Sequence, residues 1–187
     1  MRFAPVVLAL LVSAALAAPA KPVAHTPPKP VLDTLFAKLA QAQSSDDAKP
    51  IEDQIFGIFV QSGSPSVDLL MTRGAAAMGG GDADTAKKLF NAVTSLAPNF
   101  AEGWHQRAQV EQQEDDDEAA MLSLQKAITL NPRQFEAMSE LGDLLEDYGN
   151  KPGALKLYRR ALALDPQLDG AAKHLHELEK DVEGQGI

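Results

Sequence analysis

Residues 135–166 read FEAMSELGDLLEDYGNKPGALKLYRRALALDP and end on a proline that recurs upstream at a fixed interval of 34 residues. The recurring prolines are Pro98, Pro132 and Pro166. Other residue types return in the same register: Ala86, Ala120 and Ala154; Phe90, Leu124 and Tyr158; Leu96, Leu130 and Leu164. A period of this length, with two amphipathic helices per unit and a proline that stops the second, is typical of a helical solenoid.

Small residues also recur, once in each helix of a unit. They pair as Gly74 with Ala86, Ala108 with Ala120, and Gly142 with Ala154. We expect the two helices of a unit to cross at these pairs, where a branched side chain would overpack the contact at a cost of about 1–3 kcal/mol. One unit cannot cover its own apolar face, so stability must come from stacked neighbours.

This pattern resembles the tetratricopeptide repeat (TPR) family over three full units, 67–100, 101–134 and 135–168. The resemblance implies an all-α fold, a right-handed α-solenoid of helix-turn-helix units. It also implies a non-catalytic protein-protein interaction module, an adaptor or scaffold that holds a peptide or helix segment in its concave groove. The stretches DLLMTRG (68–74) and AEGWHQRA (101–108) further resemble uncharacterised exported TPR proteins of alphaproteobacteria.

The segments on either side of the three units are expected to be terminal caps. Residues 31–66 carry apolar stripes of helical period and are interpreted as a degenerate N-terminal helical pair that caps the stack, because terminal units are usually atypical. Residues 169–187 carry one apolar stripe and one charged face, which indicates a C-terminal capping helix followed by a short tail.

The first 30 residues are typical of export. Arg2, the apolar run 6–16 and the small residues around Ala17 predict a Sec-type signal peptide over residues 1–17, which is too short for a permanent membrane span. Residues 18–30 form a Pro-rich linker. We therefore expect a periplasmic or secreted protein, with no stable membrane insertion.

Composition excludes several kinds of site. The chain has no cysteine, which rules out disulfides and Cys-ligated zinc. Its net charge of −9 argues against nucleic acid as a partner and favours a protein or peptide with a basic or amphipathic segment. His174 and His176 are two apart on a helix and cannot share a metal, and no hydrolase motif is present. We therefore expect no catalytic residue, no cofactor and no metal.

Two features leave alternatives open. The acidic turn Glu114–Glu118 is either a cation site or a solvated turn that favours the start of the next helix. Arg73 and Arg107 take equivalent positions and serve either structure or ligand binding.

First helices are expected to line the concave groove, which would be graded from apolar to anionic along the stack. The predicted partner-binding residues are Met71 and Met78 in the first unit; His105, Gln109 and Gln112 in the second; and Glu136, Glu140, Asp143, Glu146 and Asp147 in the third. The alternative function is a self-associating structural protein of the cell envelope.

Overall fold

The computed structural model describes residues 29–183, and within this range the chain is entirely helical. The helices are α1 (Lys29–Leu39), α2 (Ser45–Phe59), α3 (Pro65–Gly79), α4 (Ala83–Leu96), α5 (Ala101–Gln113), α6 (Asp117–Leu130), α7 (Phe135–Asp147), α8 (Lys151–Leu162) and α9 (Ala171–Glu183). The signal peptide at 1–17 and the linker up to residue 28 lie outside the described residues. Lys29 and Pro30, predicted to end the linker, instead begin α1.

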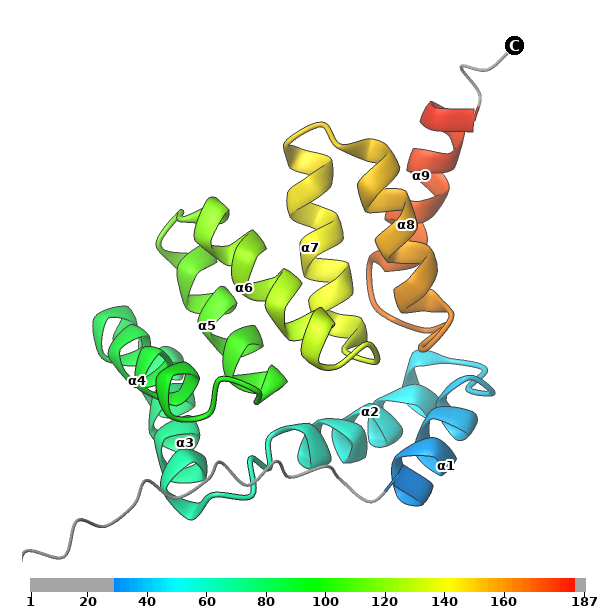
Figure 1. Cartoon of the computed structure of the whole chain (residues 1–187). Helices are drawn as coiled ribbons and strands as arrows, with labels where there is room; N and C mark the ends of the chain where they lie inside the picture. Colours follow the sequence, from blue (N-terminus) through cyan, green and yellow to red (C-terminus); the bar gives the residue numbers. More distant parts are fainter. Residues whose placement is uncertain (1–28, 184–187) are drawn as a thin grey trace, which may run out of the picture.

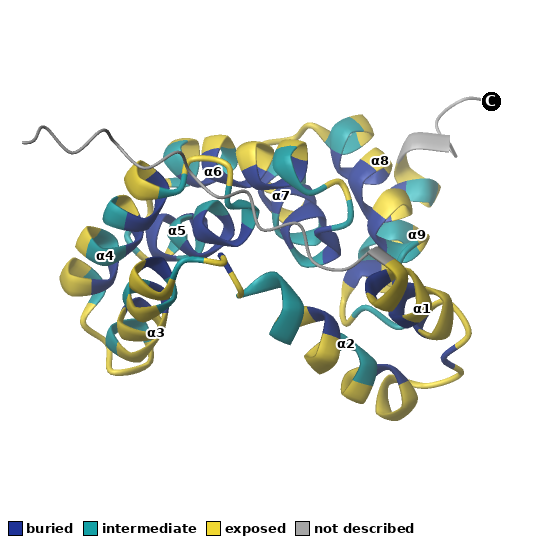
Figure 2. Ribbon diagram, turned by 60° about the horizontal axis from the view of Figure 1, so that its bottom comes forward, coloured by how far each residue is buried: buried dark blue, intermediate teal, exposed yellow. Residues whose placement is uncertain are grey.

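Helices α3 to α8 pack as three antiparallel pairs that follow one another in a curved row (Figure 1). Figure 2 shows α3, α5 and α7 on the inner side of the curve and α4, α6 and α8 on the outer side. Helix α9 packs on α8 and buries Ala171 and Leu178 at the end of the row. The structure is therefore an all-α solenoid, as predicted.

Each second helix of a pair begins with the same backbone arrangement. The residue at the turn has a positive φ, and its successor accepts a hydrogen bond from the backbone N–H three residues later. The positive-φ residues are Gly81, Asp115 and Gly149, and the capping residues are Asp82, Asp116 and Asn150. Glycine and aspartate are among the residues that adopt this conformation most readily, and Asp or Asn is a preferred helix cap. The period of the sequence is thus also a period of backbone geometry.

At two of the predicted crossings, Gly74 and Gly142, the nearest neighbour is an aromatic ring of the second helix and not the predicted small residue. A Cβ atom placed on Gly74 would lie 2.7 Å from Cε1 of Phe90, and one on Gly142 would lie 2.9 Å from Cε1 of Tyr158. Both rings are fully buried and have no room to move aside. The large residue of the second helix therefore fills the space that the glycine leaves.

The N-terminal helix pair does not cap the first unit, and this part of the sequence interpretation is wrong. Helix α1 packs instead on the third unit, where the ring of Phe36 meets that of Phe135 edge-on at 6.1 Å between centroids. In Figures 1 and 2, α2 runs from the base of α3 across the open side of the curve to α1, which lies below α8. The apolar stripe of α1 belongs to one buried cluster with Phe135 and Leu157 of the third unit.

No helix among the described residues is both long and apolar enough to cross a membrane.

The contacts of the helical glycines predict that alanine substitutions at Gly57 and Gly74 change the stability of the protein in opposite directions. Gly57→Ala in α2 should stabilise the protein by up to about 1 kcal/mol, because no atom lies within 4 Å of the added Cβ and alanine is the better helix former. Gly74→Ala should destabilise it, because the clash with Phe90 costs about 1–3 kcal/mol and exceeds that gain. Urea unfolding followed by circular dichroism measures both, and a rise in stability for Gly74→Ala equal to that of Gly57→Ala would contradict the crossing.

Candidate partner-binding site

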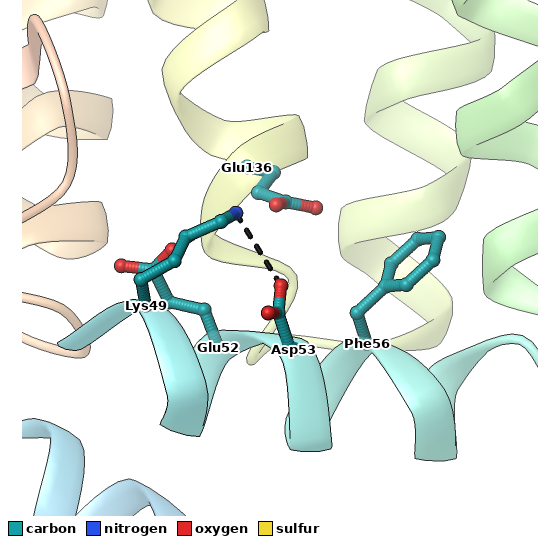
Figure 3. Close-up of a pocket in the computed structure, with 5 residues that line it drawn as sticks. All are labelled: Lys49, Glu52, Asp53, Phe56 and Glu136. Carbon is teal, nitrogen blue, oxygen red and sulfur yellow. Dashed lines mark ion pairs between the residues drawn. The ribbon is translucent and has the colours of Figure 1, made fainter. Parts of the chain in front are cut away.

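A cleft of about 260 Å³ lies between α2 and α7 (Figure 3). Four of its lining residues, Lys49, Glu52, Asp53 and Phe56, come from α2, and Glu136 comes from the first turn of α7. Figure 3 shows these side chains in the space between the two helices. The cleft exists because α1 holds α2 across the open side of the stack.

The cleft carries three carboxylates and one ammonium group. The Nζ atom of Lys49 lies 3.4 Å from Oδ1 of Asp53 and 3.6 Å from Oε2 of Glu52. Burial raises the pKa of Glu136, the carboxylates of Glu102 and Glu140 raise it further, and the cations of His105 and Lys49 lower it. Beside the acids, the ring of Phe56 is 41% exposed. The site therefore offers excess negative charge next to an accessible aromatic face.

Behind Glu136, a buried polar network joins α5 to α7. Glu102 and His105 are each 1% exposed. The Oε1 and Oε2 atoms of Glu102 accept hydrogen bonds from the side-chain amides of Gln106, at 2.8 Å, and Gln134, at 2.5 Å. The Nε2 atom of His105 lies 3.1 Å from Oε2 of Glu140 on α7. A charged imidazole between the two carboxylates offsets the free-energy cost of burying them.

Burial alone would lower the pKa of His105, but the carboxylates of Glu140 and Glu102 outweigh burial and raise it well above its ordinary value. The raised pKa favours the charged form of His105, which pairs with Glu140 and joins α5 to α7. His105 lies inside the contact between α5 and α7 and not on the groove surface.

The structure places the predicted groove residues of the first two units differently from the sequence interpretation. Met71 is buried with Val67 and Phe90, and Met78 packs against the same cluster, because both lie on the stripe of α3 that faces the neighbouring helices. His105 is buried as described above. Gln109 donates to Oε1 of Glu140 at 3.0 Å, and Gln112 is half-buried. An apolar half of the groove, which required exposed methionines, is therefore absent from these positions.

The acidic residues of α7 divide into two groups. Glu136 faces the cleft, and Glu140 lies behind it against His105. Asp143 and Glu146 turn toward the next helices: both accept a hydrogen bond from the hydroxyl of Tyr158 on α8, and Glu146 lies 3.0 Å from Nδ1 of His174 on α9. Asp147 is exposed. Only part of the predicted acidic surface is brought together.

Sequence reasoning missed the four cleft residues on α2. Nothing in their local sequence indicates a site, since the approach of α2 to α7 depends on where α1 docks. The available signal was the leucine and phenylalanine stripe of α1, which is more apolar than a solvent-facing cap requires.

Three side chains of the acidic turn Glu114–Glu118 have structural roles. Glu114 pairs with Lys87, Asp116 caps α6, and Asp117 accepts a hydrogen bond from the hydroxyl of Tyr148 at 3.0 Å. Across residues 29–183 no group of three or more histidine, aspartate or glutamate side chains is arranged to hold a metal ion.

Arg73 and Arg107, which take equivalent positions in the sequence, differ in their surroundings. The Nε atom of Arg107 donates to Glu111 at 2.7 Å, and its guanidinium lies 5.3 Å from the ring centroid of Trp104. Arg107 is therefore structural, whereas Arg73 is exposed on α3.

Residues 101–134 and 135–168 match family models described as tetratricopeptide repeat. Residues 101–168 therefore carry tetratricopeptide repeats. The chain is 27% identical over 161 residues to a TPR repeat-containing protein of Rhizobium etli, an alignment that covers 86% of this chain and 79% of that relative. This confirms the TPR resemblance drawn from the sequence.

Two solved structures have a similar fold. The first TPR domain of Spaghetti (RPAP3), bound to an HSP90 peptide, is 20% identical, with a TM-score of 0.58 over 63% of this chain and 95% of that one. The Yersinia enterocolitica chaperone SycD, in complex with a peptide of the translocator YopD, is 14% identical, with a TM-score of 0.58 over 63% and 95%.

The His105 network predicts a stability that depends on pH. Because the pKa of His105 is higher in the folded than in the unfolded chain, its stabilisation is complete below about 6.5 and is lost as pH rises through the folded value. His105→Gln should therefore cost most at acidic pH, up to about 3–5 kcal/mol, and less at alkaline pH.

Melting temperatures of the wild type and His105→Gln, measured across pH, provide the test. His176→Gln on the exposed face of α9 is the control and should leave the profile unchanged. A constant difference between the wild type and His105→Gln at every pH would show that His105 is held neutral.

Proposed function

We propose that the protein is a non-catalytic adaptor of the bacterial cell envelope that holds a basic, amphipathic peptide segment in the cleft between α2 and α7. One observation carries this proposal: three carboxylates surround a single lysine beside an exposed phenylalanine. Such a surface is complementary to a segment that carries Lys or Arg next to an apolar residue.

Lys49 is a weak occupant of the cleft. Its side chain and that of Asp53 are both about two-thirds exposed, at 68% and 67%. An exposed ion pair of this kind contributes about 0–1 kcal/mol, so a partner's cation can replace Lys49 at Asp53 and Glu136 at little cost. Phe56 then offers its ring to the apolar part of the segment or to the cation itself.

The comparisons support a peptide as the partner. The domain of Spaghetti holds an HSP90 peptide, and SycD holds a peptide of YopD. Because those likenesses concern the fold, the basic character of the segment proposed for this protein rests on its own cleft.

Export is a separate part of the proposal and is supported by Arg2, the apolar run 6–16 and the small residues around Ala17. Cell fractionation with N-terminal sequencing tests it. A mature chain beginning near residue 18 in the envelope fraction is the expected result, and an unprocessed cytoplasmic chain would contradict it.

Neutralising the cleft should weaken binding of a basic peptide. The variant Asp53→Asn with Glu136→Gln should lose up to roughly 30-fold in affinity for a lysine- and leucine-containing probe peptide at low salt, since each charge is worth up to about 1 kcal/mol. Its salt dependence should also flatten. Calorimetric titration measures both quantities.

The matched control is Asp84→Asn with Glu118→Gln, which removes two exposed carboxylates from the first turns of the outer helices α4 and α6. Phe56→Ser should weaken binding without changing the salt dependence. Equal affinities for the cleft variant and its control would place the partner elsewhere.

A second candidate function, self-association, is favoured by the first unit. Because α1 and α2 lie elsewhere, α3 packs only on α4 and α5 to any extent among the described helices, and Leu69 and Leu96 are 50% and 61% exposed. If copies associate through this unit, light scattering should show a mass that falls on dilution, and Leu69→Ser with Leu96→Ser should make the protein monomeric. A monomer at every concentration would exclude this function.

A further inference from the structure

One arginine of this protein binds a carboxylate and a phenylalanine ring that lie one helical turn apart. Arg133, in the turn between α6 and α7, pairs with Asp33 of α1, at 2.5 Å between Nη1 and Oδ1. Its guanidinium carbon lies 3.8 Å from the ring centroid of Phe36 on the same helix. Its Nη2 atom also donates to the carbonyl of Leu32 at 3.2 Å. Asp33 and Phe36 together form a site for a guanidinium group.

Helix α2 carries the same arrangement at the cleft. Asp53 and Phe56 are three residues apart, as are Asp33 and Phe36, and residues at this spacing lie on one face of a helix. The side chains of Asp33 and Asp53 are almost equally accessible, at 64% and 67%. The rings differ, because Phe36 is 7% exposed whereas Phe56 is 41% exposed. Helix α2 thus repeats the acid and the ring of the arginine site and leaves the ring accessible.

The opposite wall of the cleft provides a further acceptor. Figure 3 shows Glu136 of α7 across the cleft from Asp53. A guanidinium group has five N–H donors in one plane, so it can bind two acceptors while its face rests on a ring. In the site on α1 these acceptors are Asp33 and the carbonyl of Leu32, and in the cleft Asp53 and Glu136 offer two carboxylates.

Lys49 does not make the contact with the ring. It precedes Asp53 by four residues, whereas Phe56 follows Asp53 by three, and Figure 3 shows Lys49 and Phe56 on opposite sides of Asp53. An ammonium group is also compact and strongly hydrated, whereas a guanidinium group is planar, weakly hydrated and stacks on aromatic faces. Lys49 therefore partly neutralises the acids and leaves the ring of Phe56 available.

A third site in the chain shows the same preference for arginine. The Nε atom of Arg107 donates to Oε1 of Glu111 at 2.7 Å, while its guanidinium lies 5.3 Å from the ring centroid of Trp104. This protein thus places an arginine between a carboxylate and an aromatic ring twice, at Arg107 and at Arg133.

We propose that the cleft is an arginine site, which holds the guanidinium of one arginine of the partner segment between Asp53, Glu136 and the ring of Phe56. This inference rests on the proposed function and narrows its ligand from a basic segment to an arginine. The cleft volume of about 260 Å³ is below the range of about 300–1,000 Å³ typical of pockets for drug-sized ligands. The cleft therefore admits one long side chain, and the rest of the segment lies outside it.

Three probe peptides test the choice of arginine. They contain alanine and leucine and differ at a single position, which is arginine, lysine or citrulline, the last being a neutral analogue of arginine. Calorimetric titration at low salt should give an affinity for the arginine peptide roughly 2- to 5-fold above that for the lysine peptide, from the contact with the ring. The citrulline peptide should bind most weakly. Equal affinities for arginine and lysine would overturn the inference, and so would a citrulline peptide that binds as well as arginine.

Substitutions of Phe56 test the role of the ring. Phe56→Leu keeps an apolar side chain and should remove the preference for arginine, whereas Phe56→Trp should increase it, because tryptophan gives the strongest contact with a cation. The matched control is Tyr148→Leu, which removes another exposed aromatic ring, 63% exposed and bonded to the carboxylate of Asp117. This control should leave the preference unchanged. A preference that survives in Phe56→Leu would overturn the inference.

The outcomes separate this inference from the proposed function. Equal binding of the arginine and lysine peptides would contradict only the arginine site, whereas no binding of any peptide would contradict the proposed function of the cleft as well. Free arginine distinguishes a peptide from a small-molecule ligand. It should compete with the arginine peptide only at much higher concentration, and an equal affinity would overturn the assignment of the cleft to a partner segment.

Discussion

The close approach of paired helices sets the geometry on which everything else in this structure depends. In the first and third units a glycine on the inner helix admits the ring of Phe90 or Tyr158 from the outer helix, so that the two backbones cross at short range. Close pairs stacked side by side present inner helices in a regular row, and this row forms the wall that α2 faces (Figure 2). A wider crossing would separate the helices and leave the rings unpacked.

The charged groups buried in that wall are tolerated because they pair with one another. Glu102, His105 and Glu140 would each be costly to bury alone, but together with the amides of Gln106 and Gln134 they compensate one another between α5 and α7. The same arrangement leaves Glu136 half-buried beside α2, and its burial raises its pKa. The wall is thus acidic where the hairpin crosses it, and this acidity is a product of the packing behind it.

How much of this could be predicted from the sequence depends on whether a contact is local or distant. The repeat period and the all-α fold depend on residues within one unit or its neighbour, and these predictions are confirmed. The position of α1 depends on Phe36 meeting Phe135, about a hundred residues along the chain, and no periodicity records it. The predicted groove wrongly includes Met71 and His105, because helical spacing alone cannot distinguish an inner surface from a contact between neighbouring units.

The wrong prediction for the position of the α1–α2 hairpin and the wrong prediction for the groove have the same physical cause. If the N-terminal pair were stacked on the first unit, the inner helices would be accessible to solvent along their whole length. Their exposed residues would then line the groove. Docking on the third unit instead brings Glu52 and Asp53 to the side of Glu136. The same contact therefore creates the cleft, so any condition that separates α1 from the third unit also separates the two walls of the cleft. The proposed binding of a peptide therefore depends on the docking of the hairpin, in which Arg133 holds α1 against the third unit.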